Sequence, residues 1–442
     1  MQRQAKKMVP HHFFNSVLAS VADSEPTLRS MAIGAGLQRG DTIAKQSFWE
    51  RISKPEAVAF FKACVMEAFK TNLKSVCPVE PLNGIGRILI GDSSAIELHR
   101  SLNEIFPGGS NQNKQSAQLR LQCTLDLLSG QWVDGGFERY LRQDAKAAHD
   151  LVEKNVLKKA DLIIRDLGYA VIDSFAGIAA KDAFFLSRLH PQWNVYSDAA
   201  KGDKLDLITL LEQKAIVEGS CFRMKVRIGS RQKMPCELIA VRIPAAVAAT
   251  RRRRAREVAR RKGVTHTKRY MRLQNWTLLV TNLDESSATI DQLCELYRLR
   301  WRVEMFFKLC KSHTPLKKIA CHRTNPYHAE VMLWAWLFLM VGLSSQSVFA
   351  MAEVRIFPPP QFEAQRPFTV HPRLHVLNRS AFKIMPQLLR LISYAIKTQW
   401  LPDGATLVER ILVQCDYHNQ YEKRNDRISL PQRLRSMLQI SA

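Results

Sequence analysis

The chain has 442 residues, of which 46% are hydrophobic and 24% charged, a composition that excludes wholesale disorder and collagen-like repeats. Its 65 lysines and arginines outnumber its 40 acids, so the formal net charge is +25. Such an excess favours a polyanionic partner, most simply nucleic acid, with an anionic membrane surface as the alternative. The longest apolar run, 331–343, is too short to cross a bilayer and predicts a buried helix, so we expect no membrane partner.

The beginning of the sequence, MQRQAKKMVPHHFF, lacks the apolar stretch of a secretory signal. The nine cysteines include no Cys-x2-Cys pair, which argues against both a disulfide framework and a zinc site. We therefore expect reduced thiols and a cytoplasmic protein.

Residues 1–82 are expected to form a helical DNA-binding region. Apolar residues recur at three- and four-residue spacing in the segments 13–21, 41–52 and 55–69, which is typical of amphipathic helices. The segment 43–52 could be the recognition helix of a helix-turn-helix or an ordinary helix of a small bundle. The sequence leaves both interpretations open.

Residues 83–189 are expected to form the first part of an α/β core, because strand and helix patterns alternate there. Two short apolar runs, 87–94 and 161–166, predict buried strands. Alternating polar and apolar residues over 117–128 predict a strand with one solvated face, which returns at 132–137. Two further segments have the spacing of helices: 140–159 and 175–189.

Residues 190–275 are expected to form a β-rich insertion domain. Its predicted strands are 193–196, 221–228 and 235–243. After them, Pro244 opens a helix that Gly263 ends. That helix contains four consecutive arginines: Arg251, Arg252, Arg253 and Arg254. Because four consecutive residues surround a helix, we expect this segment to lie against phosphates or in water rather than to pack closely on protein. A solvated, disordered loop is the alternative.

Residues 276–355 are expected to complete the core, and residues 356–442 to form a linker and a helical C-terminal region. The predicted elements of the second core part are a strand at 276–281 and helices at 291–311 and 326–353. Prolines between 358 and 367 mark the linker, and the basic tail after residue 375 is a candidate dimer contact.

The predicted helix 291–311 has two distinct faces when it is turned by about 100° per residue. One face is apolar and is expected to be buried: Leu299, Val303, Phe306, Phe307 and Cys310. The neighbouring stripe carries a phenol, a carboxylate and three cations: Tyr297, Arg300, Glu304, Lys308 and Lys311. An ordinary solvated face with ion pairs such as Glu304 to Lys308 would have the same composition.

Two aspartates follow the apolar strands of the core. Asp92 comes after one run and Asp166 after the other, and acids at the ends of adjacent strands converge at one edge of a sheet. With a third carboxylate from a helix they would bind two Mg²⁺ ions about 3.5–4 Å apart, the arrangement that phosphodiester chemistry uses. Each aspartate by itself could equally be a turn residue or a helix N-cap.

The spacing Tyr297-x2-Arg300-x3-Glu304-x6-Lys311 matches the YREK signature. With Asp92 in GDSS and Asp166 in IRDLGY, the chain resembles the DDE transposases of bacterial insertion sequences, the insertion-sequence-four family. The resemblance covers residues 85 to about 350.

The resemblance implies an α/β fold with an RNase H-like catalytic core and a β-rich insertion, flanked by helical N- and C-terminal regions. It also implies metal-dependent cut-and-paste transposition, in which hydrolysis frees a 3′-hydroxyl at each element end and that hydroxyl attacks target DNA. The catalytic residues would be Asp92, Asp166 and Glu304, binding two Mg²⁺ ions for which Mn²⁺ could substitute.

The remaining site residues would contact DNA. By the resemblance, Tyr297, Arg300 and Lys311 would bind backbone phosphates, with Lys308 assisting. In relatives that cut through a DNA hairpin, a tryptophan at the comparable place stacks on a flipped base, and Trp276 would have this role here. The alternative role of Trp276 is that of a core tryptophan at a strand start.

The expected partner is double-stranded DNA, both the element ends and the target, bound by a homodimer in the cytoplasm and nucleoid of a bacterium. Two alternatives stay open: a non-catalytic or domesticated DNA-binding relative, and an RNase H-like nuclease without strand transfer.

Overall fold

A computed structural model describes residues 8–23, 26–74, 84–109, 116–199, 202–231, 233–321, 324–344 and 381–398. The chain forms two compact units. The first unit comprises residues 1–79, 92–142 and 302–442, and the second comprises residues 80–91 and 143–301. The chain leaves the second unit and enters the first after Gly91, inside the first strand, Ile88–Glu97. The domain boundaries expected from the sequence stay a prediction.

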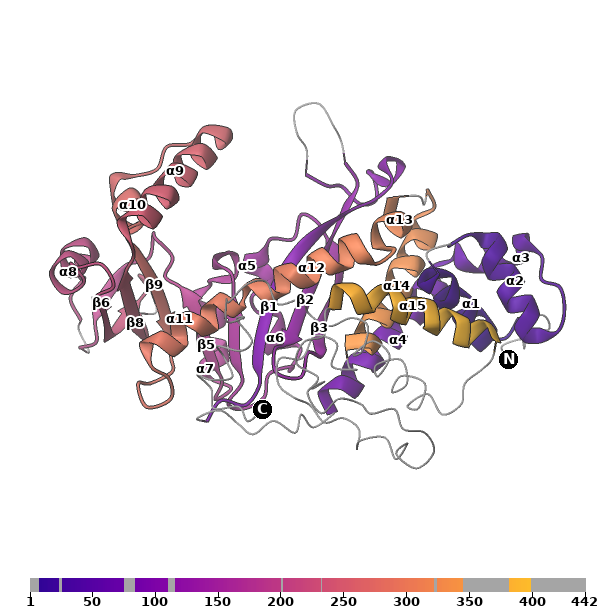
Figure 1. The fold of residues 1–442 in the computed structure, drawn as a ribbon, viewed down its shortest axis with the longest axis horizontal. Coiled ribbons are helices and arrows are strands. Elements are labelled where there is room, and N and C mark those ends of the chain that lie inside the picture. The colour runs from indigo at the N-terminus through magenta and orange to yellow at the C-terminus, as the bar shows by residue number, and fades with distance from the viewer. Residues whose placement is uncertain are drawn as a thin grey trace, which may run out of the picture. The chain divides into compact units, whose positions relative to one another are not determined.

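Nine strands pair in the order β3-β2-β1-β4-β5-β9-β8-β7-β6 (Figure 1). The ladders β1–β4 and β4–β5 are parallel, whereas β2–β3 and every ladder from β5 to β6 are antiparallel. The order β3-β2-β1-β4-β5 is that of an RNase H-like core, so the expected fold class is confirmed. The strand bounds are β1 Ile88–Glu97, β2 Gln118–Asp126, β3 Trp132–Arg139, β4 Leu162–Arg165, β5 Phe184–Arg188, β6 Val195–Ser197, β7 Cys221–Ile228, β8 Met234–Arg242 and β9 Trp276–Thr281.

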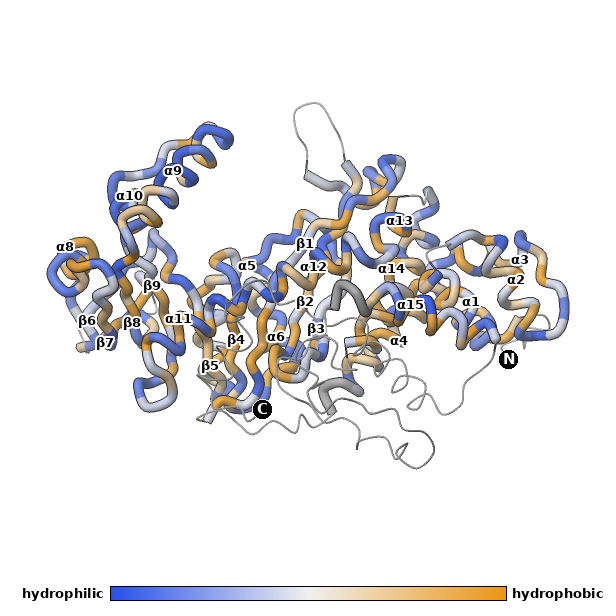
Figure 2. Tube along the Cα trace, in the orientation of Figure 1, coloured by the Kyte–Doolittle hydropathy of each residue, from blue (hydrophilic) through white to orange (hydrophobic). Residues whose placement is uncertain are grey.

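The strands of the insertion extend this sheet instead of forming a separate one. They join it through β9, which pairs with β5 on one side and with β8 on the other. Both predicted strands 221–228 and 276–281 are found at those bounds. Figure 2 shows that β4 and β5 are hydrophobic, as expected for strands covered on both faces.

The first unit is mainly helical around β2 and β3. Helix α14 packs against α4 and β3, and α1 packs against α2, α14 and α15. The sequence prediction missed α2, whose apolar periodicity is weak, although Thr27 caps its first turn and Gly40 ends it in the left-handed conformation. The helix bounds are α1 Pro10–Ala22, α2 Leu28–Arg39, α3 Lys45–Ile52, α4 Pro55–Lys74, η1 Arg100–Leu102, α12 Trp301–His313, α13 Leu316–Cys321, α14 Pro326–Ser344 and α15 Ala381–Thr398.

Helix α14 contains the longest apolar run of the sequence. It is the one helix in the described part of the chain that is long and apolar enough to cross a membrane, and 78% of its apolar window is buried inside the protein. The sequence prediction of a buried helix is therefore confirmed.

Helix α15 lies in the C-terminal region, where a helical tail was expected. Its buried side faces α1, and the Ser393 hydroxyl donates to the Ala19 carbonyl at 3.1 Å. The linker at 358–367 and the rest of the tail lie outside the described residues, so the candidate dimer contact stays a prediction.

The second unit corrects two predicted helices. The segment 140–159 holds two short helices instead of one long one. The predicted helix 175–189 ends early, because Asp182 has a left-handed backbone (φ 52°) and the next residues form β5. A short apolar run has the same appearance in a buried strand and in a helix, so periodicity could not separate them. The helix bounds are α5 Asp144–Ala147, α6 Asp150–Glu153, η2 Leu167–Tyr169, α7 Ile172–Ala179, α8 Leu207–Lys214, α9 Ala245–Lys262, α10 Lys268–Leu273 and α11 Ile290–Leu299.

The packing of β5 can be tested with Phe185→Ala. Phe185 is 1% exposed and its ring stacks on Phe175 with centroids 4.2 Å apart. Removing the ring leaves a cavity, so we expect the free energy of unfolding in urea to fall by about 3–5 kcal/mol. Ile216→Ala, at a side chain that is 64% exposed, is the control and should change it by less than about 0.5 kcal/mol. Equal effects would contradict this account of the core.

Candidate active site

Asp166 directly follows β4, as predicted, whereas Asp92 lies inside β1. Strands β1 and β4 run parallel with Ile88 opposite Leu162 and Gly91 opposite Arg165. Asp92 and Asp166 are the residues that come directly after this last registered pair. One detail differs from the prediction, because β1 does not end there but continues to Glu97.

Asp92, in the first unit, belongs to a short hydrogen-bonded network. Its Oδ1 accepts from the Ser93 backbone N–H at 2.8 Å, and the Ser93 hydroxyl accepts from the Arg120 guanidinium at 3.0 Å. Arg120 also donates to the Tyr140 carbonyl at 3.1 Å and lies over the Tyr140 ring. The polar residues after the apolar run are thus tied to β2 and to the end of β3.

The predicted helix 291–311 is two helices. α11 ends at Leu299 and α12 begins at Trp301. The Arg300 N–H bonds to the carbonyl of Tyr297, three residues back, so the chain tightens locally and the ladder of four-residue bonds is interrupted. The predicted apolar face is nevertheless confirmed, since its five residues are at most 5% exposed: Leu299, Val303, Phe306, Phe307 and Cys310.

The break divides the polar stripe between the two units. Tyr297 and Arg300 belong to the second unit together with Asp166. Glu304, Lys308 and Lys311 belong to the first unit, as does Asp92, and all three are exposed on α12.

In the second unit, Arg300 and Tyr297 lie close to Asp166. The Nε atom of Arg300 is 3.8 Å from Oδ1 of Asp166, whose side chain is 46% exposed. The Tyr297 hydroxyl is buried and has no hydrogen-bond partner within the described residues. Burial, and secondarily the Asp166 carboxylate, raise the pKa of Tyr297 to about 12, and the cations Arg188 and Arg300 offset only part of this shift. The phenol is therefore neutral and can donate a hydrogen bond at neutral pH.

In the first unit, α12 is held by its apolar face while its charged groups stay accessible. The Phe306 ring packs edge-on against Trp132, with centroids 5.1 Å apart. On the other face, partial burial lowers the pKa of Lys311, and the nearby Glu97 carboxylate opposes this shift. Burial of the Cys123 thiol on β2, with Cys310 and Asp92 nearby, raises its pKa. Both α12 and Asp92 therefore lie close to β2.

The three acids do not form a complete cluster within one unit. Asp92 and Glu304 belong to the first unit and Asp166 to the second. Over the ranges that the structure describes, no three His, Cys, Asp or Glu side chains are gathered as metal ligands. The convergence of the three acids on two metal ions therefore stays a prediction.

Comparison with known proteins assigns the chain to a family by its sequence. The sequence profile described as "Transposase DDE domain" matches residues 83–340, which is more than half of the chain. The chain belongs to the transposase DDE domain family. This assignment confirms the resemblance to the DDE transposases of bacterial insertion sequences that the sequence motifs indicated.

Several transposases of bacterial insertion elements are similar in sequence to this chain. The chain is 25% identical over 288 residues to the transposase of insertion sequence element IS231B from Bacillus thuringiensis subsp. berliner, covering 62% of this chain and 59% of that protein. It is 24% identical over 240 residues to the transposase of IS1151 from Clostridium perfringens, covering 51% and 50%. The matched part thus spans less than two thirds of these relatives. A solved piggyBac transposase synaptic complex with hairpin DNA is similar with a TM-score of 0.42 and 9% identity, over 97% of this chain and 81% of that one.

The arginine-rich helix of this protein was only partly predicted. α9 runs from Ala245 to Lys262, between Pro244 and a left-handed Gly263, as expected, so the alternative of a disordered loop is wrong. The expectation that it would not pack on protein is also wrong. Three small residues, Ala248, Ala255 and Ala259, are buried on one stripe of the helix.

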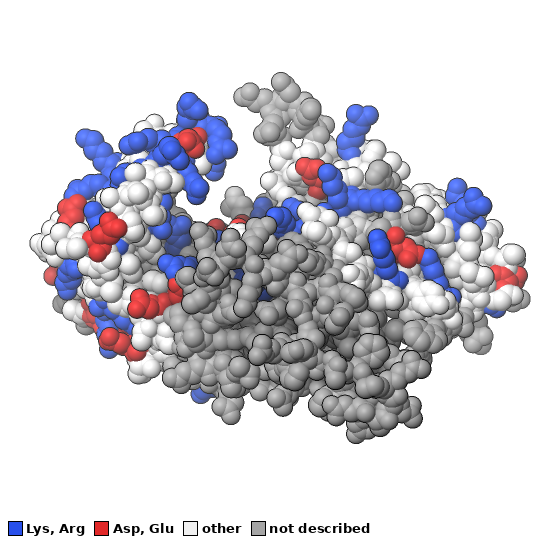
Figure 3. Space-filling view, in the orientation of Figure 1, with Lys and Arg blue, Asp and Glu red and all other residues white. Residues whose placement is uncertain are grey.

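Two of the four arginines anchor α9 to the start of β9. Arg251 donates to the Trp276 carbonyl and to the Thr277 hydroxyl, both at 3.2 Å, and Arg252 donates to the Asn275 side chain. Long side chains can pack their aliphatic stems on protein and still form hydrogen bonds at their tips. The prediction from four consecutive arginines that surround the helix did not allow for this. Arg253 and Arg254 are exposed, and Figure 3 shows a dense group of basic side chains over α9 and α10.

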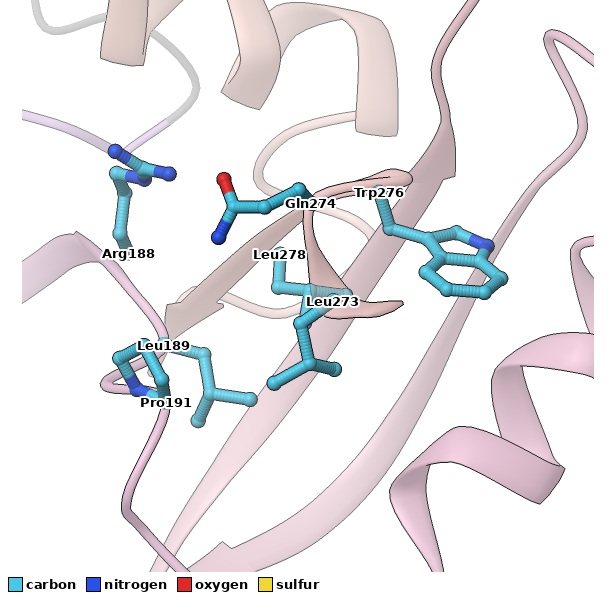
Figure 4. Close-up of a pocket in the computed structure, with 7 residues that line it drawn as sticks. All are labelled: Arg188, Leu189, Pro191, Leu273, Gln274, Trp276 and Leu278. Carbon is cyan, nitrogen blue, oxygen red and sulfur yellow. The ribbon is translucent and has the colours of Figure 1, made fainter. Parts of the chain in front are cut away.

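Trp276 does not occupy a position that a base could stack on. It is 3% exposed, its indole N–H donates to the Ala215 carbonyl at 3.0 Å, and the Arg242 guanidinium lies 4.4 Å from the ring centroid. Figure 4 shows the indole directed away from the other side chains of the neighbouring pocket. The alternative role, that of a core tryptophan at a strand start, fits this structure.

Arg188 is a site residue that the sequence analysis missed. It ends β5, lines the pocket of Figure 4 with Gln274, and its charge acts on both Tyr297 and Arg251. No carboxylate within the described residues forms an ion pair with it. The signal was a charged residue soon after the apolar run Phe184–Leu186, which is similar to the pattern that identified the aspartates, but this run was interpreted as helix.

The ionisation of Tyr297 provides a test of the second-unit geometry. Because burial raises the pKa of Tyr297 in the folded protein to about 12 from the ordinary tyrosine value of 10.0, the linked stability is complete below pH 10 and is lost as the pH rises to about 12. The ultraviolet absorbance of the wild type is titrated with pH, and that of Tyr297→Phe is subtracted from it. The difference, which reports the Tyr297 tyrosinate, should rise near pH 12. A signal that rises near pH 10, as in a free phenol, would contradict the buried position.

Proposed function

We propose that this protein is the metal-dependent transposase of an insertion sequence, which cuts DNA by hydrolysis at the element ends and then joins the freed 3′-hydroxyl to target DNA. The observation that supports it best is the parallel register of β1 and β4, whose last pair, Gly91 with Arg165, directly precedes Asp92 and Asp166 in sequence. The parallel ladder ends there because β4 stops at Arg165, and α/β proteins bind ligands where parallel strands end.

The donor set fits a hard divalent cation. Asp92, Asp166 and Glu304 offer only carboxylate oxygens, which Mg²⁺ prefers, and the exposed Glu304 and half-exposed Asp166 leave room for the water that Mg²⁺ keeps. When bound by these residues, two Mg²⁺ ions would activate the attacking oxygen and stabilise the leaving oxygen, and Mn²⁺ could substitute for them.

The cationic groups around the acids would hold the DNA backbone. Arg300 is close to Asp166 and has the planar fork that grips phosphate oxygens in pairs. The neutral Tyr297 phenol would donate to a phosphate oxygen, and the ammonium groups of Lys311 and Lys308 would act as point charges on α12. Arg188, beside Tyr297, would add a further phosphate contact. The chain would thus orient the reacting phosphodiester through hydrogen-bond donors and positive charges.

Two further regions would bind DNA away from the reacting phosphate. The exposed arginines of α9 would contact the backbone without reading sequence. In the N-terminal region, α3 follows α2 after a short turn and buries Phe48 and Ile52, which leaves Lys45 and Gln46 exposed. This arrangement is compatible with segment 43–52 being either a recognition helix or an ordinary bundle helix. We propose that α3 reads the terminal inverted repeats. Two element ends need two copies of the site, so the active form would be a homodimer.

Glu304→Gln tests the catalytic assignment. The change removes a carboxylate but keeps its size, so we expect end cleavage in Mg²⁺ or Mn²⁺ to fall by at least about 100-fold while end binding is retained. Asp92→Asn and Asp166→Asn should behave alike, and Asp291→Asn, at an exposed acid of α11, should cut normally. Normal cleavage by Glu304→Gln would refute the catalytic site. If the wild type and all the variants bind the element ends without cutting them, the non-catalytic alternative holds. If the wild type cuts the ends but does not join them to a plasmid target, the protein is a nuclease.

Arg254→Gln tests the DNA contact of α9. Each phosphate contact releases counterions, so losing one should reduce the slope of log binding constant against log salt concentration by about 1. Lys181→Gln, which removes one exposed positive charge at the end of α7, is the matched control and should leave the slope unchanged. Equal changes in the two variants would mean that α9 contributes only net charge.

A further inference from the structure

A buried arginine of the insertion connects it to the loop that precedes α11. Arg223 lies on β7 with only 5% of its side chain exposed, and it forms an ion pair with Glu237 on β8. Its two terminal nitrogens donate to the carbonyls of Ala288 at 2.5 Å and Leu283 at 2.6 Å. One guanidinium therefore holds both ends of the segment 283–288, and Glu237 neutralises its charge.

The same loop is fixed to the core sheet from its other side. The Asn282 side chain accepts from the Phe185 N–H at 2.8 Å and donates to the Ala183 carbonyl at 2.9 Å, which ties the loop to β5. Within the loop, hydrogen bonds from Ser286 and Ser287 lower the pKa of Asp284 to about 2. The loop is thus a rigid connection, held by β5 and by β7.

Helix α11 begins directly after this loop. Thr289 and Gln292 form a reciprocal capping box at its first turn, and α11 then packs against β5 and β7. Its buried residues Leu293 and Leu296 leave Tyr297 and Arg300 to approach Asp166. The start and direction of α11 thus decide where the phenol and the guanidinium lie.

We infer that Arg223 is a positioning residue of the active site, through which the insertion sets the place of Tyr297 and Arg300. The inference rests on the proposed role of these two residues as phosphate contacts. Arg223 touches only protein groups, so it acts through α11. Its planar fork can reach two carbonyls and a carboxylate at once, whereas a lysine at this position would offer a single point charge. The insertion is then a support for the catalytic signature as well as a carrier of the basic helix.

The test compares Arg223→Met and Arg223→Lys with Arg227→Met. Arg227 lies four residues along the same strand and pairs with Asp198 at 3.6 Å in a partly exposed position, so it matches the charge and strand of Arg223 without reaching the loop. Measurements are hydrogen exchange of the α11 amides, single-turnover end cleavage at saturating DNA, and thermal unfolding of the full chain.

We expect Arg223→Met to lose protection in α11 and to cut about 10- to 100-fold more slowly at temperatures where it is folded, since small displacements of positioned groups have effects of this size. Arg223→Lys, which keeps the charge beside Glu237, should fold like the wild type and still cut slowly. Arg227→Met should match the wild type in both measurements. Wild-type cleavage by folded Arg223→Lys would overturn the inference.

A double-substitution cycle separates positioning from general damage. If Arg223 acts through Tyr297, adding Tyr297→Phe to Arg223→Lys should slow cleavage much less than Tyr297→Phe slows the wild type. If the double variant is instead slowed by the product of the two single reductions in rate, Arg223 supports only the fold, and the inference is overturned. Failure of the proposed function has a different signature, because Glu304→Gln would then cut like the wild type whatever the Arg223 variants do.

Discussion

The parallel pairing of β1 with β4 is the constraint on which the rest of the site depends. A parallel ladder fixes the register of two strands that are more than seventy residues apart in sequence, since Gly91 pairs with Arg165. The residue after each of these is an aspartate, so both acids leave the buried part of the ladder at the same level. The apolar residues before them, such as Ile90 and Ile164, are at most 1% exposed, so this part of the ladder is buried in the core.

The large positive charge of this protein is used in two different ways. Some arginines are structural: Arg223 binds the loop before α11, Arg251 binds the start of β9, and Arg87 is paired with the buried Asp161 on two hydrogen bonds. Others, such as Arg253 and Arg254, remain on the surface of α9. A net charge of +25 therefore overstates the charge that is available to DNA, because part of it stabilises the fold.

The catalytic signature is continuous in sequence but is carried by two helices in two compact units. The interruption at Arg300 leaves Tyr297 and Arg300 with Asp166, and Glu304 and Lys311 with Asp92. Each unit therefore contains at least one of the three acids together with cationic groups. The insertion contributes to one of these halves by holding α11 through β7.

The sequence by itself determined the strands around the aspartates, the buried face of α11 and α12, the bounds of α9 and the family. Those features are local, since they follow from periodicity, from capping residues and from a four-residue motif with fixed spacing. Only the tertiary structure decided that Phe184–Arg188 is a strand, that Trp276 is a core residue, and that Arg251 and Arg223 bind backbone carbonyls. The physical reason is that each of these outcomes depends on which distant backbone group or ring lies next to the side chain. An isolated apolar run, a tryptophan or an arginine carries no record of that neighbour.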